Sequence, residues 1–231
     1  MKIGILSDIH GNGFALEVVC AELKKLDIQT IIVAGDTVGY YYDIEKVLFL
    51  LSKFQTFMIK GNHEEMLKQI INREVDQSKI RDKYGSSLFK AIQVLNKTVI
   101  DDLINLEHPK TIEIDSIKIL VAHGTPWDMN VYLYSNSDES LWNKFLTYSE
   151  AIFILGHTHH QIMKRHKDKI IINPGSVGQN RNRAGYADWA VFDTDSRSIT
   201  FHSTPYILDE LIKQCLEHDP GSSILTRMLQ R

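Results

Sequence analysis

Lys2-Ile-Gly-Ile-Leu-Ser-Asp8-Ile-His10-Gly11-Asn12 is the stretch that decides the fold. Its apolar, β-branched run predicts a buried strand of a parallel sheet, which ends in an acid, a histidine and a glycine just before a helical pattern begins. Asp8 and His10 are two residues apart, so both side chains project to the same side at the end of the strand. A carboxylate oxygen and an imidazole nitrogen placed in this way can hold one metal ion.

Strands and helices alternate through the first half of the chain. The hydrophobic pattern predicts helices over residues 13–26 and 43–54 and strands over 30–34 and 55–59. The helical pattern over residues 64–103 is too long for a simple connection between strands, so we expect a helical insertion or cap there.

The second half of the chain is richer in hairpins. Strand pairs are predicted at 111–114 with 117–121, 161–165 with 169–172, and 187–193 with 198–203, and a single strand is predicted at 151–155. The pattern also predicts helices at 138–145 and 206–216, followed by a short tail at 220–231. The combination predicts an α/β fold with one mixed sheet or two stacked sheets and helices outside. A chain of 231 residues fits a single domain over residues 1–231.

Composition narrows the class of partner. A net charge of -3 and a pI near 6.4 argue against bulk electrostatic binding to nucleic acid or anionic lipid, so we expect a small partner. The start of the chain lacks the pattern of a signal peptide, and no apolar run approaches membrane-spanning length. We therefore expect a cytoplasmic protein without a membrane partner, in which Cys20 and Cys215 are reduced and structural.

Polar residues with metal-binding side chains follow five of the predicted strands. They are Asp8, His10, Asp36, Asn62, His63, His123, His157 and His159. A single histidine beside a strand is usually a hydrogen-bonded structural residue, but open α/β sheets bind ligands at the edge where all eight are expected to meet. The set as a whole therefore predicts a metal site.

The donor types indicate the kind of metal. Carboxylate, amide oxygen and imidazole without thiolate suit Mn, Fe, Zn, Ni or Co and disfavour a structural zinc held by cysteines. Seven ligands are too many for one tetrahedral ion and enough for two ions that share a carboxylate. A site with two metal ions activates water and stabilises both oxygens of an in-line displacement at phosphorus.

Five sequence blocks together resemble the signature of the calcineurin-like metallophosphoesterase superfamily. They are Asp8-Ile-His10-Gly-Asn, Gly35-Asp36, Gly61-Asn62-His63-Glu64, Ala122-His123-Gly and Gly156-His157-Thr-His159. The resemblance spans residues 3 to about 180 and implies a four-layer αββα sandwich of two stacked mixed sheets.

The resemblance also implies a role for each residue. The resemblance implies that Asp8, His10 and His159 are ligands of one ion. It implies that Asn62, His123 and His157 are ligands of the other, and that Asp36 bridges the two. It places His63 beside the metals, where it protonates the leaving oxygen or steadies the phosphoryl charge.

Two further segments, Gly35–Tyr40 and Asn173–Gly178, resemble the bacterial and archaeal phosphodiesterase-like branch related to diadenosine tetraphosphatases. One departure concerns the Asp-Arg pair that phosphoprotein phosphatases and symmetrical tetraphosphatases carry after the bridging Asp. Gly39-Tyr40 stands there in this chain, so the usual acid beside His63 is missing. The departure argues against phosphoprotein phosphatase activity.

Three weaker signals have competing interpretations. Asn173–Gly178 can cradle a phosphate or support the metal loops from behind, and both readings stay open. Arg181 and Arg183 can contact a second phosphate, although solvated surface arginines are the commoner case. The aromatic residues Trp127, Tyr132, Tyr134 and Trp142 can stack a nucleobase, although we favour a core or a subunit interface for them.

The sequence thus predicts a dinuclear metal-dependent phosphoesterase that uses a hydroxide held between the ions on a small phosphorylated substrate, such as a phosphodiester, a phosphomonoester or a dinucleotide polyphosphate. His63 and Asp36 are its expected catalytic residues, and Asn62, Arg181 and Arg183 its expected substrate contacts. The rival from another class is a non-catalytic protein-binding scaffold on the same fold, in which metal blocks decay; here every block is intact. A nuclease would need a basic channel, which an acidic chain does not supply. A homo-oligomer stays open.

Overall fold

A computed structural model describes residues 1–221, 225 and 229, so most of the predicted tail over 220–231 lies outside the described residues. The first sheet contains five strands in the order β10-β9-β1-β2-β3. Their bounds are β1 Lys2–Leu6, β2 Thr30–Val33, β3 Gln55–Met58, β9 Tyr186–Asp193 and β10 Ser198–Pro205. Strand β1 pairs in parallel with β2 and antiparallel with β9, so the sheet is mixed.

The second sheet also contains five strands, in the order β4-β5-β6-β8-β7. Their bounds are β4 Lys110–Ile114, β5 Ile117–Val121, β6 Ile152–Ile154, β7 Gln161–His166 and β8 Lys169–Pro174. The parallel pairs β5-β6 and β6-β8 form its centre, and the hairpins with β4 and β7 form its edges.

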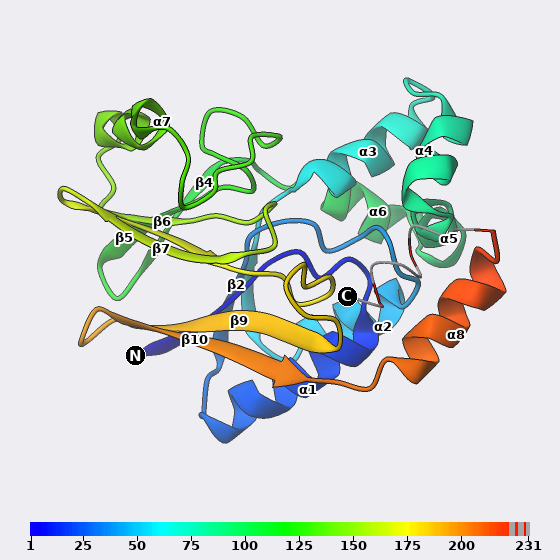
Figure 1. The fold of residues 1–231 in the computed structure, drawn as a ribbon, viewed down its shortest axis with the longest axis horizontal. Coiled ribbons are helices and arrows are strands. Elements are labelled where there is room, and N and C mark those ends of the chain that lie inside the picture. The colour runs from blue at the N-terminus through cyan, green and yellow to red at the C-terminus, as the bar shows by residue number, and fades with distance from the viewer. Residues whose placement is uncertain (222–224, 226–228, 230–231) are drawn as a thin grey trace.

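Apolar side chains from both sheets meet in one buried cluster, in which Ile3 and Ile5 of β1 pack with residues of β5 and β6 such as Ile119 and Ile154. The sheets are therefore stacked face to face (Figure 1). Helices α1 (Gly13–Lys25) and α2 (Ile44–Leu51) cover the outer face of the first sheet, because Leu16, Val19 and Val47 pack there on Val33.

The outer face of the second sheet has a thinner cover. Helix α7 (Glu139–Asn143) and the 3₁₀ turn η1 (Lys144–Thr147) place Trp142 and Phe145 on Phe153 of β6. The layers follow the order helix, sheet, sheet, helix, which confirms the α/β sandwich of two stacked mixed sheets.

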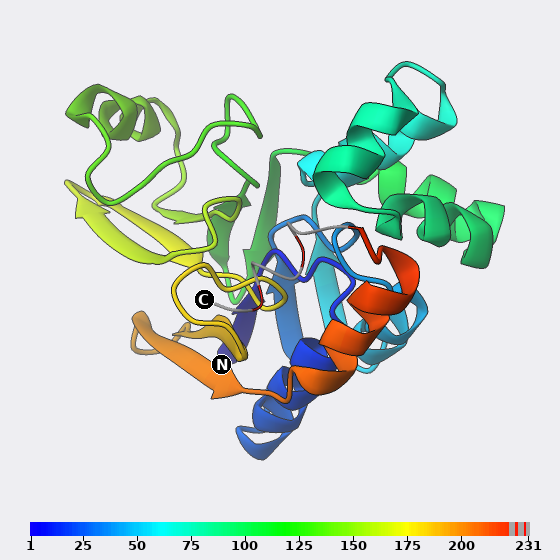
Figure 2. The same ribbon diagram turned by 45° about the vertical axis from the view of Figure 1, so that its right-hand side comes forward.

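Four helices separate β3 from β4. We call them the helical segment: α3 (Asn62–Ile71), α4 (Gln77–Tyr84), α5 (Ser87–Val94) and α6 (Lys97–Ile104). The last helix, α8 (Asp209–His218), ends beside this segment (Figure 2), and Nε2 of its last residue, His218, lies 2.8 Å from Nζ of Lys90 in α5. It begins three residues later than the sequence pattern predicts, because Tyr206 instead turns its hydroxyl toward the Asn12 amide, 3.1 Å away. In the described part of the chain, no helix is both long and apolar enough to cross a membrane.

Candidate metal centre

All eight residues with predicted metal-binding side chains come together at one edge of the sandwich. Asp8 and His10 follow β1, Asp36 follows β2, and Asn62 and His63 begin α3 just after β3. His123 follows β5, while His157 and His159 follow β6. All of them are buried except Asn62, which is half-buried. Both sheets therefore contribute side chains to one cluster.

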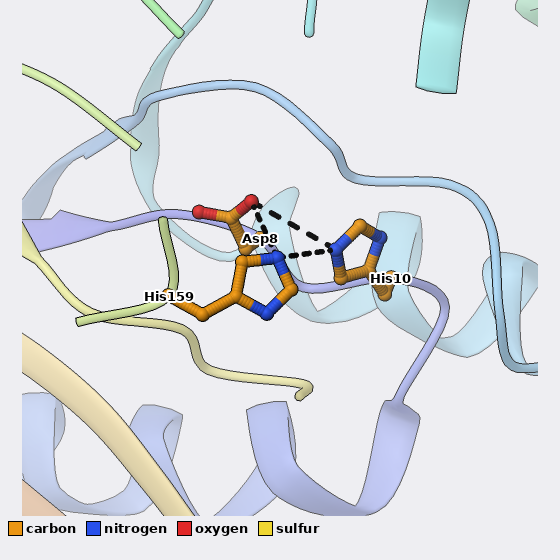
Figure 3. A group of neighbouring side chains, drawn as sticks. All are labelled: Asp8, His10 and His159. Atoms are coloured by element: carbon orange, nitrogen blue, oxygen red, sulfur yellow. Dashed lines mark hydrogen bonds and ion pairs between the residues drawn. The ribbon is translucent and has the colours of Figure 1, made fainter. Parts of the chain in front are cut away.

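One part of the cluster is formed by Asp8, His10 and His159. The Nε2 atom of His159 lies 3.2 Å from Oδ1 of Asp8 and 3.2 Å from Nε2 of His10. The three side chains point toward one another (Figure 3). Their donor atoms are close enough to share one metal ion.

A second part is formed by Asp36, Asn62, His123 and His157. The Nε2 atom of His123 lies 3.1 Å from Oδ2 of Asp36, 3.0 Å from Oδ1 of Asn62 and 3.2 Å from Nδ1 of His157. Oδ2 of Asp36 is also 3.8 Å from Nε2 of His10, so this carboxylate lies between the two parts.

Backbone carbonyl oxygens fix three of the histidine rings. Nδ1 of His10 faces the carbonyl of Val38, Nδ1 of His123 that of Ala34, and Nδ1 of His159 that of Gln179, at 3.2, 2.8 and 2.7 Å. A carbonyl oxygen can only accept a hydrogen bond, so each Nδ1 carries a proton and each Nε2 points into the cluster, where its lone pair can bind a metal ion once that nitrogen is unprotonated. Metal-binding histidines are commonly oriented in this way.

Several buried polar atoms of the cluster have no hydrogen-bond partner among the described residues. They include Oδ1 of Asp8, Nε2 of His157 and Nδ1 of His63. An unsatisfied buried polar atom is costly, and a bound metal ion is one way in which proteins satisfy such atoms. Oδ1 of Asp8 points toward Nε2 of His159, 3.2 Å away, in the first part of the cluster, as a metal ligand would.

The charge balance of the cluster also fits a cation. Burial by itself lowers the pKa of His123, but the carboxylates of Asp36 and Asp8 outweigh that effect and raise the pKa to about 10. Burial, assisted by the charge of His123, lowers the pKa of His157 to about 4. Two buried carboxylates thus retain a proton on a neighbouring histidine, and a metal ion bound there would displace that proton.

The backbone is strained where these side chains are presented. Asp8, His10, Asp36, His157 and His159 all have positive φ angles, between 52° and 69°. Left-handed backbone costs a non-glycine residue roughly 1 kcal/mol or more, and such residues concentrate at functional sites. Five of them in one cluster support a functional role for these turns.

Glu64 has a role that the sequence analysis missed. Its buried carboxylate accepts hydrogen bonds from four backbone N–H groups, those of Asp36, Thr37, Val38 and Gly61, at 2.7 to 3.1 Å. Burial and the charge of Asp36 raise the pKa of Glu64 to about 7, against the effect of these hydrogen bonds. The side chain ties the loop after β2 to the start of α3. A glutamate at the third position of a helix is a sequence signal for such a cap.

The loop Asn173–Gly178 supports the metal-centre loops from behind. The N–H groups of Val177 and Gly178 donate to the carbonyls of Ser7 and Asp8, each at 3.0 Å, and the Asn173 amide donates to the carbonyl of Gly156. These donors are used within the protein, which favours the supporting interpretation over a phosphate cradle.

His63 lies beside the cluster, and its ring contacts two tyrosine rings. Its backbone N–H donates to Oδ1 of Asp36 at 2.8 Å, and the rings of Tyr40 and Tyr84 lie 4.9 and 5.1 Å from its ring. Burial lowers the pKa of His63 to about 4. Its Nε2 is 4.0 Å from Oδ2 of Asp36, and with His10 the three residues form another group compact enough for an ion.

A pocket of about 230 Å³ opens beside the cluster. Its lining residues are Asp36, Tyr40, Asn62, His63, Lys83, Tyr84, Tyr132, His157, His159 and Arg181. Arg181 thus lines the pocket beside the cluster. The structure does not bring Arg183 into this pocket, because its guanidinium group stacks on the ring of Tyr186 at 3.6 Å.

The aromatic residues between Trp127 and Trp142 divide between core and pocket. Trp142 is buried and Trp127 packs on Phe145, as the core interpretation predicts. Tyr132 instead lines the pocket and lies 4.0 Å from the ring of His157. Cys20 and Cys215 are both free and buried, as predicted.

Comparison with known protein families gives a match over most of the chain. The profile of the calcineurin-like phosphoesterase superfamily domain matches residues 1–197. That range includes every residue of the cluster and of the pocket.

Individual relatives agree with this match. The chain is 26% identical over 239 residues to the protein MJ0912 of Methanocaldococcus jannaschii, and this alignment covers 94% of this chain and 92% of the relative. It is 25% identical over 175 residues to phosphodiesterase MJ0936 of the same organism, and this alignment covers 76% of this chain and 83% of the relative. The crystal structure of a metallophosphoesterase from Sphaerobacter thermophilus has the same fold, with a TM-score of 0.78 at 23% identity over 99% of this chain and 98% of that one.

Proposed function

The chain belongs to the calcineurin-like phosphoesterase superfamily, and from this premise we propose that it is a dinuclear metal-dependent phosphoesterase. The observation that carries the proposal is the buried cluster in which two carboxylates, four histidines and one amide converge from both sheets. The proposal treats residues 1–231 as one domain, with the helical segment as an insertion.

The proposed ligands follow the two parts of the cluster. Asp8, His10 and His159 would hold one ion, Asn62, His123 and His157 would hold the other, and Asp36 would contribute its carboxylate to both. The position of the Asp36 carboxylate, 3.1 Å from His123 and 3.8 Å from His10, supports the bridging role. The ligands suit Mn, Fe, Zn, Ni or Co. When bound, two such ions supply the hydroxide for in-line attack and stabilise charge on the phosphoryl oxygens.

The residues around the ions have separate tasks. His63 donates a proton or a hydrogen bond to the leaving oxygen, because it borders the pocket beside the cluster. Asn62 turns its amide oxygen toward His123, which leaves the amide NH₂ group to contact a phosphoryl oxygen. Arg181 provides a charged contact to a substrate in the pocket.

The rival interpretation is a protein-binding scaffold without catalysis. The cluster argues against it, because unsatisfied buried atoms such as Oδ1 of Asp8 and the strained turns have no structural benefit of their own. The test is to reconstitute the protein with each candidate metal, measure bound metal, and assay p-nitrophenyl phosphate, bis(p-nitrophenyl) phosphate and dinucleotide polyphosphates. We expect two ions and turnover. Two bound ions without hydrolysis of any substrate would support the scaffold.

We further expect activated diesters or dinucleotide polyphosphates to be cleaved with higher kcat/KM than monoesters. Arg181 is the pocket arginine that can contact the additional charged or esterified group. Arg181→Ala should then lower kcat/KM for the longer substrates by an amount equivalent to about 1–3 kcal/mol of transition-state stabilisation, and by less for monoesters. Arg183→Ala is the matched control, because Arg183 stacks on Tyr186 and does not line the pocket. A preference for monoesters, or equal effects of both variants, would contradict this expectation.

A further inference from the structure

The helical segment reaches into the pocket through the last turn of α4. Lys83 and Tyr84, the final two residues of this helix, both line the pocket. The ring of Tyr84 lies 5.1 Å from the ring of His63 and 5.7 Å from the ring of Tyr40. The segment is therefore part of the wall on the His63 side of the pocket.

Lys83 brings a positive charge to this wall. Its ammonium group lies 4.9 Å from the ring centre of Tyr84, and no carboxylate of a described residue lies within 4 Å of it. Lys79, on the same helix, instead pairs with Asp76 at 3.9 Å. An exposed cation at a pocket rim that has no acidic partner is available to an anionic ligand.

The position of the Lys83 ammonium group relative to His63 places its charge beside the expected path of the leaving group. In the proposed function His63 acts at the leaving oxygen, so the part of the substrate that leaves must pass along the wall formed by Tyr84 and Lys83. A pocket of about 230 Å³ holds a phosphoryl group and only the beginning of a larger leaving group. The remainder extends past the rim, where Lys83 lies.

We infer that Lys83 and Tyr84 select substrates whose leaving group carries a second negative charge, as in phosphoanhydrides and phosphorylated esters. Lys83 makes a charge-assisted contact to the second anionic group, while Tyr84 packs on the linking atoms. The inference rests on the proposed function, and it makes the helical segment the specificity element of the enzyme.

Asp219, just past the end of α8, holds this wall in place. Its Oδ2 atom accepts hydrogen bonds from the N–H and the hydroxyl of Ser86, at 2.8 and 2.9 Å, two residues after Tyr84. The same oxygen accepts the hydroxyl of Tyr42 at 2.5 Å, in the loop that carries Tyr40. Asp219 thus joins the end of α4 to the pocket loop and is a positioning residue for Lys83 and Tyr84.

The kinetic test compares substrates that differ in the charge of the leaving group. For Lys83→Met in the metal-loaded enzyme, we expect KM for ADP or a dinucleotide polyphosphate to rise about tenfold or more. KM for p-nitrophenyl substrates should rise much less, and the metal content should be unchanged. Lys79→Met, on the same helix and 83% exposed at its side chain, is the matched control and should change neither. Asp219→Ala should shift the same KM values in the same direction while kcat for p-nitrophenyl substrates is preserved.

A binding measurement separates this inference from the proposed function. Calorimetric titration of the metal-loaded protein with methylphosphonate and with methylenediphosphonate gives a ratio of two affinities, and it does not require turnover. The inference predicts that Lys83→Met lowers this ratio and that Lys79→Met leaves it unchanged. It is overturned if Lys83→Met leaves the ratio unchanged, or if it weakens both ligands equally. Absence of hydrolysis in the wild type would count against the phosphoesterase proposal, while the affinity ratio would still decide the role of Lys83.

Discussion

The backbone N–H of His63 donates a 2.8 Å hydrogen bond to Oδ1 of Asp36, while the ring of His63 approaches the other oxygen of the same carboxylate at 4.0 Å. Asp36 therefore contacts both the cluster and the residue beside it. The backbone contact fixes where α3 begins relative to the end of β2. A change at Asp36 should consequently affect metal binding, while a change at His63 should affect turnover.

Asp36→Asn should abolish the binding of the metal pair, because a neutral amide is a poor bridge between two cations. Metal analysis after reconstitution with Mn should show two ions for the wild type and fewer than two for the variant. Asp27→Asn is the matched control, since Asp27 is exposed and also has a positive φ of 55°. One ion in the wild type, with Asp36→Asn unchanged, would contradict the dinuclear proposal.

His63→Gln should leave metal content and fold intact while it lowers kcat by about 10² to 10⁴, the range for a general acid or base. His202→Gln is the control, because His202 stacks on Trp189 in the first sheet. Because His63, His10 and Asp36 are also close enough to hold an ion, loss of metal from His63→Gln would show that His63 is a ligand.

Gly39→Ala should damage the position of the His63 ring without removing a ligand. A methyl group at position 39 would overlap Nδ1 of His63, and the φ of Gly39 is +97°. We expect a loss in kcat of about 10², with two ions still bound. Gly185→Ala separates strain from overlap, because Gly185 has a φ of +75° and its nearest neighbouring atom is 3.4 Å from an added Cβ. Equal loss of activity in both variants would assign the effect to backbone strain alone.

Glu64→Gln should destabilise the fold by about 1–3 kcal/mol, because the amide NH₂ group would face backbone donors in place of an acceptor. Urea denaturation of metal-free protein measures the change in the free energy of unfolding. Glu65→Gln removes only a partly exposed pair with Lys60 and should cost about 0–1 kcal/mol. Comparable losses in the two variants would argue against a special role for Glu64.

The sequence predicted that the residues of the cluster come together, because they occupy the ends of strands. The position of each proposed ligand, such as Asp8 or His123, follows from strand pattern and chain order, and neighbouring strand ends meet at one edge. The supporting residues are harder to predict. Lys83 and Asp219 reach the pocket region through the packing of helices that lie far apart in sequence, and no local pattern encodes that packing.

Arg181 and Arg183 illustrate the same limit at close range. They are two residues apart in one polar turn, so the sequence predicts the same substrate contact for both. In the structure only Arg181 lines the pocket, because Arg183 is drawn onto the neighbouring ring of Tyr186. Which of two adjacent cations faces a site depends on the turn geometry and on aromatic neighbours, and neither is visible in the spacing.

The division of the proposed ligands between the two sheets has a consequence for the dynamics of the sandwich. Asp8, from the first sheet, and His157, from the second, are 149 residues apart in the chain, and a single hydrogen bond of 3.0 Å already joins them. Ions held by both sheets would act as a removable cross-link that closes this long loop, much as a disulfide does. Chelation should therefore accelerate amide hydrogen exchange first in the turns after β5 and β6, while exchange at the opposite ends of the strands stays slow.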